Sequence, residues 1–364
     1  MIAGLMLLAF FCQCLWVAQM RHLSDVEFSY LAATHAHRQG EQSSITSPIT
    51  VMAASVPLRV TDVLRRNGPA ALRAVLSVPR PWLLRLPFML FGLWLGAALW
   101  WVARRLFGDE GGYIALALYC FSPAMVMISS NIAPEIILAW SSFGLIYTAI
   151  GVAHTVYSPP RKWPPRIVLL GLSMGIAVST TLWAFTLVLL AFAFMLYLAP
   201  GRRCATVFVF ACAAGIGVVV FAVTAWFTGS GILAFRALIT PHFSWEVLKN
   251  LGLFALSKYS DGYVLVALFI LVLTAYGSWK RARYFGNSAP LLTAFAAVFL
   301  VSLVPALQLW PPALGVSFLF VFVGGVMADL LETDARRWFL WILIGAGVIK
   351  VVEDLKLLRW WVHQ

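Results

Sequence analysis

Two carboxylates, Asp25 and Glu27, follow closely on an apolar run that begins at Met1. They are among only 14 acidic residues in a chain of 364 residues that is 62% hydrophobic. One positioned carboxylate can take the proton of an attacking hydroxyl, which typically accelerates such a step by about 10²–10⁴-fold. Residues two apart diverge by about 200° on a helix, so only one of the pair can face a given site. The pattern also suits a plain helix start, with Ser24 or Asp25 as the N-cap and Glu27 in the first turn.

Glu135 is the second acid that could take part in chemistry. It closes the segment Ser130-Asn131-Ile132-Ala133-Pro134-Glu135. Pro134 ends or kinks one helix, so Glu135 is expected to open the next. A carboxylate is favourable at a helix N-terminus for electrostatic reasons alone. An ionisable residue at a membrane boundary, however, usually faces a cavity or a charged partner. Both interpretations stay open.

Basic residues expected on the same face could hold a phosphate, because Arg and Lys form charge-assisted hydrogen bonds with its oxygens. Lys258 is the foremost of them, since it directly precedes an apolar segment at a plausible headgroup height. Taken alone, each is more often a side chain that snorkels to the membrane boundary. The set is Arg59, Arg65, Arg66, Arg236, His242, Lys249 and Lys258.

Metal-binding patterns are weak. His35 and His37 would lie on opposite faces of a helix, and no His-x-x-x-His or Glu-x-x-His pair supports them. The cysteines lie in or beside apolar segments, as small buried hydrophobic residues do: Cys12, Cys14, Cys120, Cys204 and Cys212. We therefore predict no cofactor firmly, and a divalent metal remains an alternative.

The composition determines the class of protein that must position these residues. Only 11% of the residues are charged and the mean hydropathy is +0.89, which excludes ordinary soluble classes. Apolar stretches near the length that crosses about 30 Å of hydrocarbon recur along the chain. We predict an all-α polytopic membrane protein with about 11 (10–12) transmembrane helices. The expected spans are 1–20, 82–103, 112–130, 136–157, 167–182, 184–200, 204–227, 262–279, 288–309, 313–331 and 338–352.

Two of these expectations rest on local detail. The first span has no basic leader or small-residue cleavage site, so it is interpreted as a retained helix and not as a signal peptide. Only Ser179-Thr180-Thr181 separates the fifth span from the sixth. The glycines of Gly215-Ile216-Gly217 fall inside a span and are interpreted as helix-packing residues.

The net charge of +12 is distributed as short basic clusters between spans, which argues against nucleic-acid binding. Such clusters mark cytoplasmic loops, so the N-terminus is predicted inside and the C-terminus outside. The external face then carries the loops 21–81 and 228–261. The clusters are Arg104-Arg105, Arg161-Lys162 with Arg166, Arg202-Arg203, Lys280-Arg281 with Arg283, and Arg336-Arg337.

The first external loop is predicted to contain short amphipathic helices that lie in the membrane interface. Leu58, Val63 and Leu64 would share an apolar side, opposite Arg59 and its charged neighbours. A second segment follows Gly68-Pro69, with Leu72, Val75 and Leu76 as its apolar residues. The helices would either anchor the loop or form a platform for a lipid-linked substrate.

Several motifs in order along the chain carry a family resemblance. Arg85-Leu86-Pro87 is followed by Arg104-Arg105-Leu106-Phe107-Gly108, then by Ser122-Pro123 and Pro134-Glu135. This progression resembles the GT-C class of membrane glycosyltransferases, in particular its protein O-mannosyltransferase and aminoarabinose-transferase branch (glycosyltransferase family 39). The resemblance is strongest over about residues 80–140 and weaker to roughly residue 340.

The resemblance implies inverting transfer of a hexose or pentose from a polyprenyl-phosphate donor to an acceptor on the extracytoplasmic face. Asp25 inherits the role of general base and Glu135 that of a supporting acid, with Glu27 also placed in the catalytic set. The lipid phosphate would be held by cations, namely Lys258, Arg59, Arg65, Arg236 and His242.

Together these inferences predict one GT-C-like domain over 1–352, an external tail at 353–364 and no soluble C-terminal domain. The expected location is a bacterial inner membrane, and the expected partners are a lipid-linked sugar, an envelope acceptor (lipid, glycan or protein) and the bilayer. The alternative function is a non-catalytic GT-C-derived subunit of a membrane complex. A transporter is disfavoured, because ionisable residues cluster at span ends and no inverted repeat is evident.

Overall fold

The structure is a computed structural model that describes residues 1–38, 47–67, 81–228, 293–297 and 311–332, with short pieces between 341 and 359. Within these residues every regular element is a helix, as predicted for an all-α membrane protein. Four helical segments are long and apolar enough to cross a membrane: Ile2–Met20, Pro81–Cys120, Pro134–Thr155 and Pro200–Thr228. The main helices are α1 (Ile2–Met20), α2 (Asp25–Arg38), α3 (Pro48–Asn67), α5 (Pro81–Cys120), α6 (Pro123–Ser129), α7 (Pro134–Thr155), α8 (Pro164–Thr180), α9 (Phe185–Leu198), α10 (Arg203–Thr228) and α15 (Pro311–Leu331).

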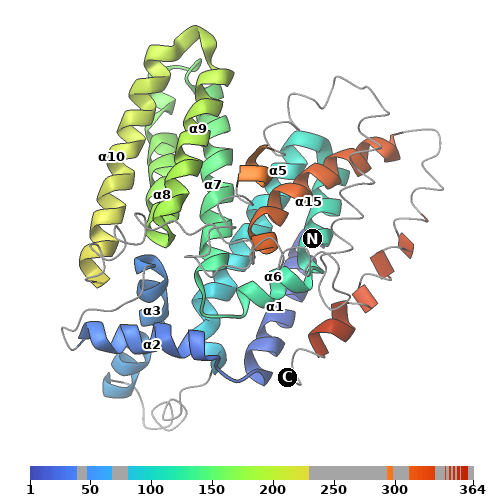
Figure 1. The fold of residues 1–364 in the computed structure, drawn as a ribbon. Coiled ribbons are helices and arrows are strands. Elements are labelled where there is room, and N and C mark those ends of the chain that lie inside the picture. The colour runs from blue at the N-terminus through green and yellow to red at the C-terminus, as the bar shows by residue number, and fades with distance from the viewer. Residues whose placement is uncertain are drawn as a thin grey trace, which may run out of the picture.

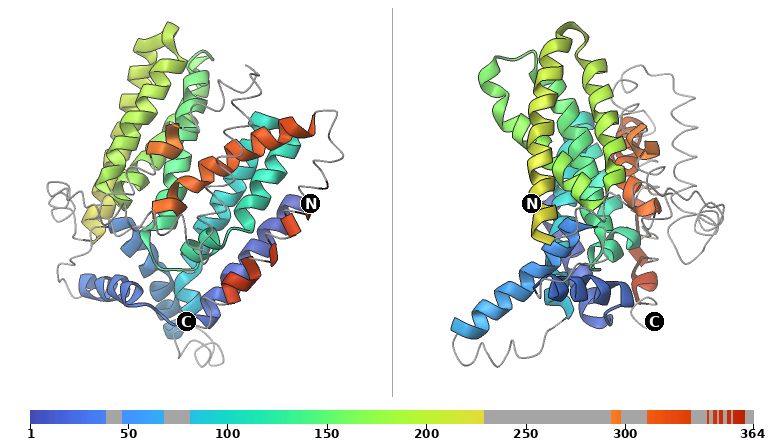
Figure 2. Two further views of the ribbon diagram at one scale, coloured as in Figure 1. Left: turned by 45° about the vertical axis from the view of Figure 1, so that its right-hand side comes forward. Right: turned by 60° about the vertical axis from the view of Figure 1, so that its left-hand side comes forward.

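The helices form a bundle whose two ends differ. Helices α7 to α10 run up and down beside one another, while α15 crosses α5 on the other side of α7 (Figure 1, Figure 2). Helices α2 and α3 lie at the lower end of Figure 1, where α1 finishes. The α7–α8 and α9–α10 connections lie at the opposite, upper end. The acids of α2 and the basic clusters of those two connections are therefore separated by the length of the bundle.

The second and third predicted spans form one long element with a sharp turn. Helix α5 contains the predicted span 82–103 and turns at Gly108, whose φ of 83° lies in the region that favours glycine. The predicted third span, 112–130, is broken in the middle, because α5 ends at Cys120 and α6 begins at Pro123. Gln13 of α1 donates a hydrogen bond to the carbonyl of Cys120 (3.4 Å), which satisfies one of the carbonyls freed by the break.

The weak boundary between the fifth and sixth predicted spans is confirmed. Helix α8 ends at Thr180, a 3-10 turn covers Leu182–Ala184, and α9 starts at Phe185. The predicted spans 204–227 and 313–331 correspond to α10 and α15. The predicted spans 262–279 and 288–309 lie wholly or mostly outside the described residues, so the total of eleven stays a prediction.

The loop predicted to be the first external one contains two described helices, α2 and α3. Of the predicted apolar side of α3, Leu58 is half-buried and Val63 is exposed, while the side chain of Leu64 lies outside the described residues. The exposed apolar stripe consists of Val56, Val60 and Val63. The second predicted segment of this loop, with Leu72, Val75 and Leu76, falls outside the described residues.

Close packing of α8 against α10 depends on small residues. A methyl group added at Gly175 would lie 2.5 Å from Cβ of Val220 and 2.8 Å from the carbonyl oxygen of Gly217. Gly217 itself faces α8, where an added Cβ would lie 3.2 Å from that of Met174. No atom of a described residue lies within 4 Å of a Cβ added at Gly215. The prediction of helix-packing glycines is therefore supported at Gly217 but not, among the described residues, at Gly215.

We expect Gly175→Leu to destabilise the protein by about 1–3 kcal/mol, since the two helix backbones must separate to make room for it. Unfolding in mixed micelles with increasing SDS would measure this. Gly215→Leu is the matched control and should leave the transition unchanged. Equal effects of the two substitutions would contradict close packing at Gly175.

Candidate functional site

A buried ion pair joins α2 to α5. Arg85 and Glu27 are 0% and 1% exposed, and their charged groups form two parallel hydrogen bonds. Nε of Arg85 donates to Oε1 of Glu27 (2.8 Å), and Nη2 donates to Oε2 (2.7 Å). This bidentate arrangement is the strongest form of an Arg–carboxylate contact.

The remaining donors of Arg85 cap the end of α1. Its Nη1 donates to the carbonyls of Ala18 (3.0 Å) and Arg21 (2.9 Å), and Nη2 also donates to that of His22 (2.9 Å). The last carbonyls of a helix have no partner within the helix, and the partial negative charge there favours a cation. Arg85 therefore serves as the cap of α1 as well as the partner of Glu27.

Glu27 in turn completes the start of α2. Its Oε2 accepts the backbone N–H of Ser24 (2.9 Å), and the N–H of Glu27 donates to Oγ of Ser24 (3.3 Å), which is a capping box. Its Oε1 also accepts the N–H of Ile132 from the α6–α7 connection (3.0 Å). Burial raises the pKa of Glu27, but the Arg85 guanidinium and the two N–H donors outweigh burial and hold it below its ordinary value.

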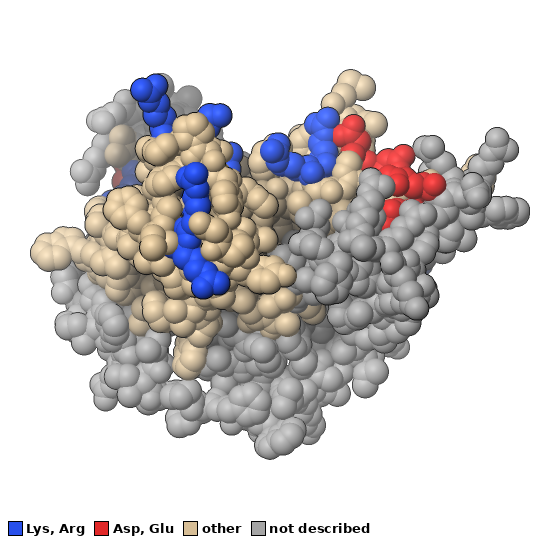
Figure 3. Space-filling model, turned by 90° about the horizontal axis from the view of Figure 1, so that it is seen from above, with Lys and Arg blue, Asp and Glu red and all other residues tan. Residues whose placement is uncertain are grey.

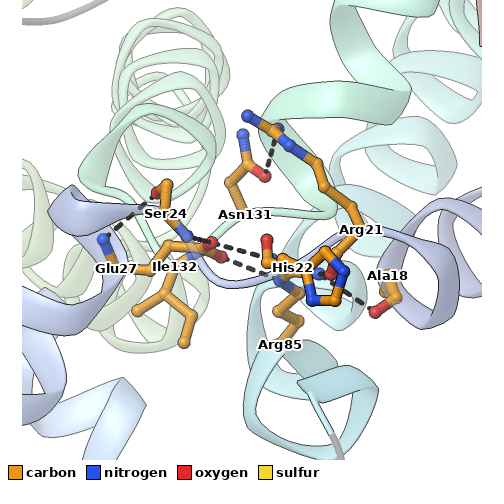
Figure 4. A network of polar contacts seen from close by, with 8 residues as sticks. All are labelled: Ala18, Arg21, His22, Ser24, Glu27, Arg85, Asn131 and Ile132. Atoms are coloured by element: carbon orange, nitrogen blue, oxygen red, sulfur yellow. Dashed lines mark hydrogen bonds and ion pairs between the residues drawn. The ribbon is translucent and has the colours of Figure 1, made fainter. Parts of the chain in front are cut away.

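A further contact ties the α6–α7 connection to the same network. Nη1 of Arg21 donates to Oδ1 of Asn131 (3.0 Å). Figure 4 shows how the α1–α2 turn, the start of α5 and the α6–α7 connection converge on the Glu27–Arg85 pair. We call these residues (Arg21, Ser24, Glu27, Arg85, Asn131 and Ile132) the inter-helix clamp.

Asp25 stands outside the clamp. It is the first residue of α2 and is exposed, whereas Glu27 two positions later is buried. Its carboxylate makes no hydrogen bond or ion pair with any residue in the described ranges. The predicted divergence of the two acids is thus observed: one is committed to structure and the other is available to solvent or a ligand.

Glu135 lies in the first turn of α7, as predicted, with Pro134 before it and no side-chain cap. It is half-buried and close to α2, because its carboxylate acts on Tyr30 of that helix. Burial raises the pKa of Tyr30, and the negative charge of Glu135 raises it further. The clamp therefore holds the helix start that carries Glu135 beside the helix that begins with Asp25.

The cations predicted to hold a phosphate are only partly described. Arg59 of α3 is exposed, and its guanidinium lies 5.2 Å from the ring centroid of Phe227 at the end of α10. Arg65 belongs to α3, but its side chain is not among the described ones. Arg236, His242 and Lys258 lie entirely outside the described residues. The described residues contain no group of three or more His, Cys, Asp or Glu that could hold a metal.

The structural role of Arg85 was not predicted, because the residue appears in the sequence analysis only as part of the Arg85-Leu86-Pro87 motif. A signal was present, because an arginine five residues into an apolar helix must find a partner for its charge. The only acid of the preceding loop at a capping-box spacing from a serine is Glu27. That combination predicts a structural pair.

Comparison with known proteins supports the fold. Residues 70–227 match the family model described as dolichyl-phosphate-mannose-protein mannosyltransferase. No curated protein matches the sequence significantly. Two of the similar solved structures are ArnT from Cupriavidus metallidurans, in the apo state (16% identity, TM-score 0.60) and bound to undecaprenyl phosphate (17%, 0.61). Each ArnT alignment covers 95% of this chain.

The archaeal oligosaccharyltransferase AglB from Archaeoglobus fulgidus, in complex with an inhibitory peptide and a dolichol-phosphate, is also similar. It is 10% identical with a TM-score of 0.55, and the alignment covers 98% of this chain and 55% of AglB. The chain spans 60% and 61% of the length of the two ArnT structures. The chain therefore shares the fold of the ArnT and AglB structures, and its residues 70–227 resemble the mannosyltransferase family model.

Proposed function

We propose that the protein transfers a sugar from a polyprenyl-phosphate donor to an acceptor on the extracytoplasmic side of a bacterial inner membrane. The observation that carries this proposal is the inter-helix clamp, which fixes two acid-bearing helix starts at one end of the bundle. The likeness to an ArnT structure with bound undecaprenyl phosphate supports the class of donor.

In the proposed reaction an acceptor hydroxyl attacks the anomeric carbon of the sugar from the side opposite the phosphate. The new carbon–oxygen bond forms as the bond from the anomeric carbon to the phosphate oxygen breaks, and the polyprenyl phosphate leaves with that electron pair. Asp25 takes the hydroxyl proton. The configuration at the anomeric carbon is inverted, because a single displacement occurs.

The other residues have supporting roles in the proposal. Glu135 adds negative charge beside α2 and helps to orient the acceptor. Arg59, together with the undescribed Arg65, Arg236, His242 and Lys258, would stabilise the charge that develops on the departing phosphate. The proposal gives Glu27 no catalytic role, because both of its carboxylate oxygens accept hydrogen bonds from structural donors.

The topology in the proposal follows from the two ends of the bundle. The α7–α8 and α9–α10 connections, with their basic residues, would face the cytoplasm, and α2 and α3 would face outward. The apolar stripe of Val56, Val60 and Val63 would then rest on the outer leaflet, at the height where Trp226 and Phe227 end α10.

Purified protein in nanodiscs, supplied with radiolabelled undecaprenyl-phosphate sugars, tests this function. We expect sugar-dependent release of undecaprenyl phosphate once a suitable acceptor is present, and inhibition by free undecaprenyl phosphate. The proposal would be overturned in favour of a non-catalytic subunit if the protein neither bound nor turned over the donor and co-purified with other membrane proteins in stoichiometric amounts.

A further inference from the structure

Five cations gather at the upper end of the bundle, far from the clamp. Arg161 and Lys162 lie in the α7–α8 connection and Arg166 in the first turn of α8, while Arg202 ends the α9–α10 connection and Arg203 begins α10. All five are exposed, and neither segment 156–166 nor segment 199–206 contains an acid. Figure 3 views this end of the molecule and shows blue side chains over tan surface, with the red acidic groups to one side. We call these five residues the upper basic patch.

The two connections that carry the patch are joined to each other. Nη1 of Arg202 donates to the carbonyl of Val156 (3.1 Å), and its guanidinium lies 5.8 Å from the ring centroid of Tyr157. Nε1 of Trp163 donates to the carbonyls of Thr155 (3.2 Å) and Ser158 (3.1 Å). The backbone beneath the patch is therefore fixed by hydrogen bonds, and the charges are held close to one another.

The basic cluster at the turn of α5 is different, because it carries its own counter-charge. Nε of Arg104 donates a hydrogen bond to Oδ1 of Asp109, and Glu110 follows directly. In contrast, none of the five residues of the upper basic patch forms an ion pair with a described residue. Exposed like charges that are held together without an internal partner attract anions from outside the chain.

We propose that the upper basic patch binds the phosphate headgroup of anionic phospholipids in the leaflet on this side of the membrane. The patch lies where four apolar helices end, so its charges are at headgroup depth. Tyr157 and Tyr197 are exposed at the same ends and Trp163 is half-buried there, and such aromatic residues are typical of the membrane interface. Arg and Lys bind phosphate through charge-assisted hydrogen bonds, and each is worth about tenfold or less in affinity for an anionic surface.

Native mass spectrometry of the protein in neutral detergent, titrated with phosphatidylglycerol or phosphatidylcholine, tests the proposal. The variant is Arg161→Gln/Lys162→Gln, which removes two exposed charges without touching the hydrogen bonds of Arg166 or Arg202. We expect it to bind phosphatidylglycerol about 10–30-fold more weakly than the wild type. The matched control, Arg104→Gln/Arg105→Gln, also removes two charges and should lose less than threefold.

Other results would overturn the proposal. Equal losses in the two variants would indicate diffuse attraction to the whole surface, and equal affinity of the wild type for the two lipids would exclude headgroup charge. If the variant does not fold, the wild type remains informative, since affinity for phosphatidylglycerol must fall as salt is raised. Displacement of the lipid by an equal concentration of soluble glycerol phosphate would assign the patch to free anions instead.

Discussion

Glu27→Ala is expected to destabilise the protein by about 3–5 kcal/mol, although the residue is only one of two neighbouring acids on the same loop. The substitution leaves the guanidinium of Arg85 fully buried without its counter-charge. It also removes the acceptor for the N–H groups of Ser24 and Ile132. Helix α2, helix α5 and the α6–α7 connection thus lose the contact that joins them. The lower stability should be measured as a lower SDS concentration at the midpoint of unfolding.

The control for this prediction is Asp25→Ala, because Asp25 is exposed and makes no hydrogen bond or ion pair with a described residue. We expect it to cost less than about 1 kcal/mol, the scale of an acid at a helix N-terminus. A similar loss from both substitutions would contradict the assignment of Glu27 to structure.

A double-mutant cycle separates the ion pair from the other contacts of Arg85. Replacing both members of a buried pair by apolar residues is often neutral. Here Glu27→Leu/Arg85→Met should remain destabilised, since the carbonyls of Ala18, Arg21 and His22 lose their donor. Full recovery in the double variant would mean that capping of α1 by Arg85 contributes little.

The sequence was sufficient for the fold class and for most helix positions, because both follow from local patterns. Apolar stretches long enough to cross a bilayer predicted α1, α7 and α10 to within a few residues. Even the weak boundary at Ser179-Thr180-Thr181 was right, since a helix that turns back must place its polar groups at the end.

The break in the third predicted span had a less certain signal. Pro123 follows Ser122 in the middle of the apolar run, and such a proline can either kink a helix or end it. The structure ends α5 at Cys120, where Gln13 of α1 supplies a donor for the freed carbonyl. That partner is 107 positions away in sequence, so no local pattern could have selected between a kink and a break.

The sequence singled out Asp25 and Glu27 but did not show how the roles of the two residues differ. The sequence placed Asp25 and Glu27 in one loop and left a capping box and a catalytic acid as alternative interpretations. In the structure Glu27 closes a capping box, whereas Asp25 is exposed and its role as general base stays a prediction. Glu27 is assigned to structure by Arg85, whose side chain reaches the α1–α2 turn only in the folded bundle.

If the protein is the proposed transferase, Asp25→Asn is expected to lower the rate of sugar transfer by about 10²–10⁴-fold. Asparagine keeps the size and hydrogen-bonding shape of the side chain but cannot accept the proton of the acceptor hydroxyl. Because Asp25 makes no hydrogen bond or ion pair with a described residue, the fold and donor binding should be unchanged. The measurement is kcat for transfer from a saturating undecaprenyl-phosphate sugar, with the Kd of the donor measured separately.

Glu27→Asp is the matched control, since it retains a carboxylate two positions away and shortens the reach of that group toward Arg85 and toward the N–H groups of Ser24 and Ile132. A general base and a positioning residue should respond differently. Asp25→Asn should lower kcat at unchanged thermal stability, whereas Glu27→Asp should lower stability and kcat together, with activity recovering as the temperature is reduced. Wild-type kcat in Asp25→Asn would eliminate Asp25 as the base. Loss of kcat in Glu27→Asp without any loss of stability would return Glu27 to the catalytic set, because the clamp would then not explain its effect.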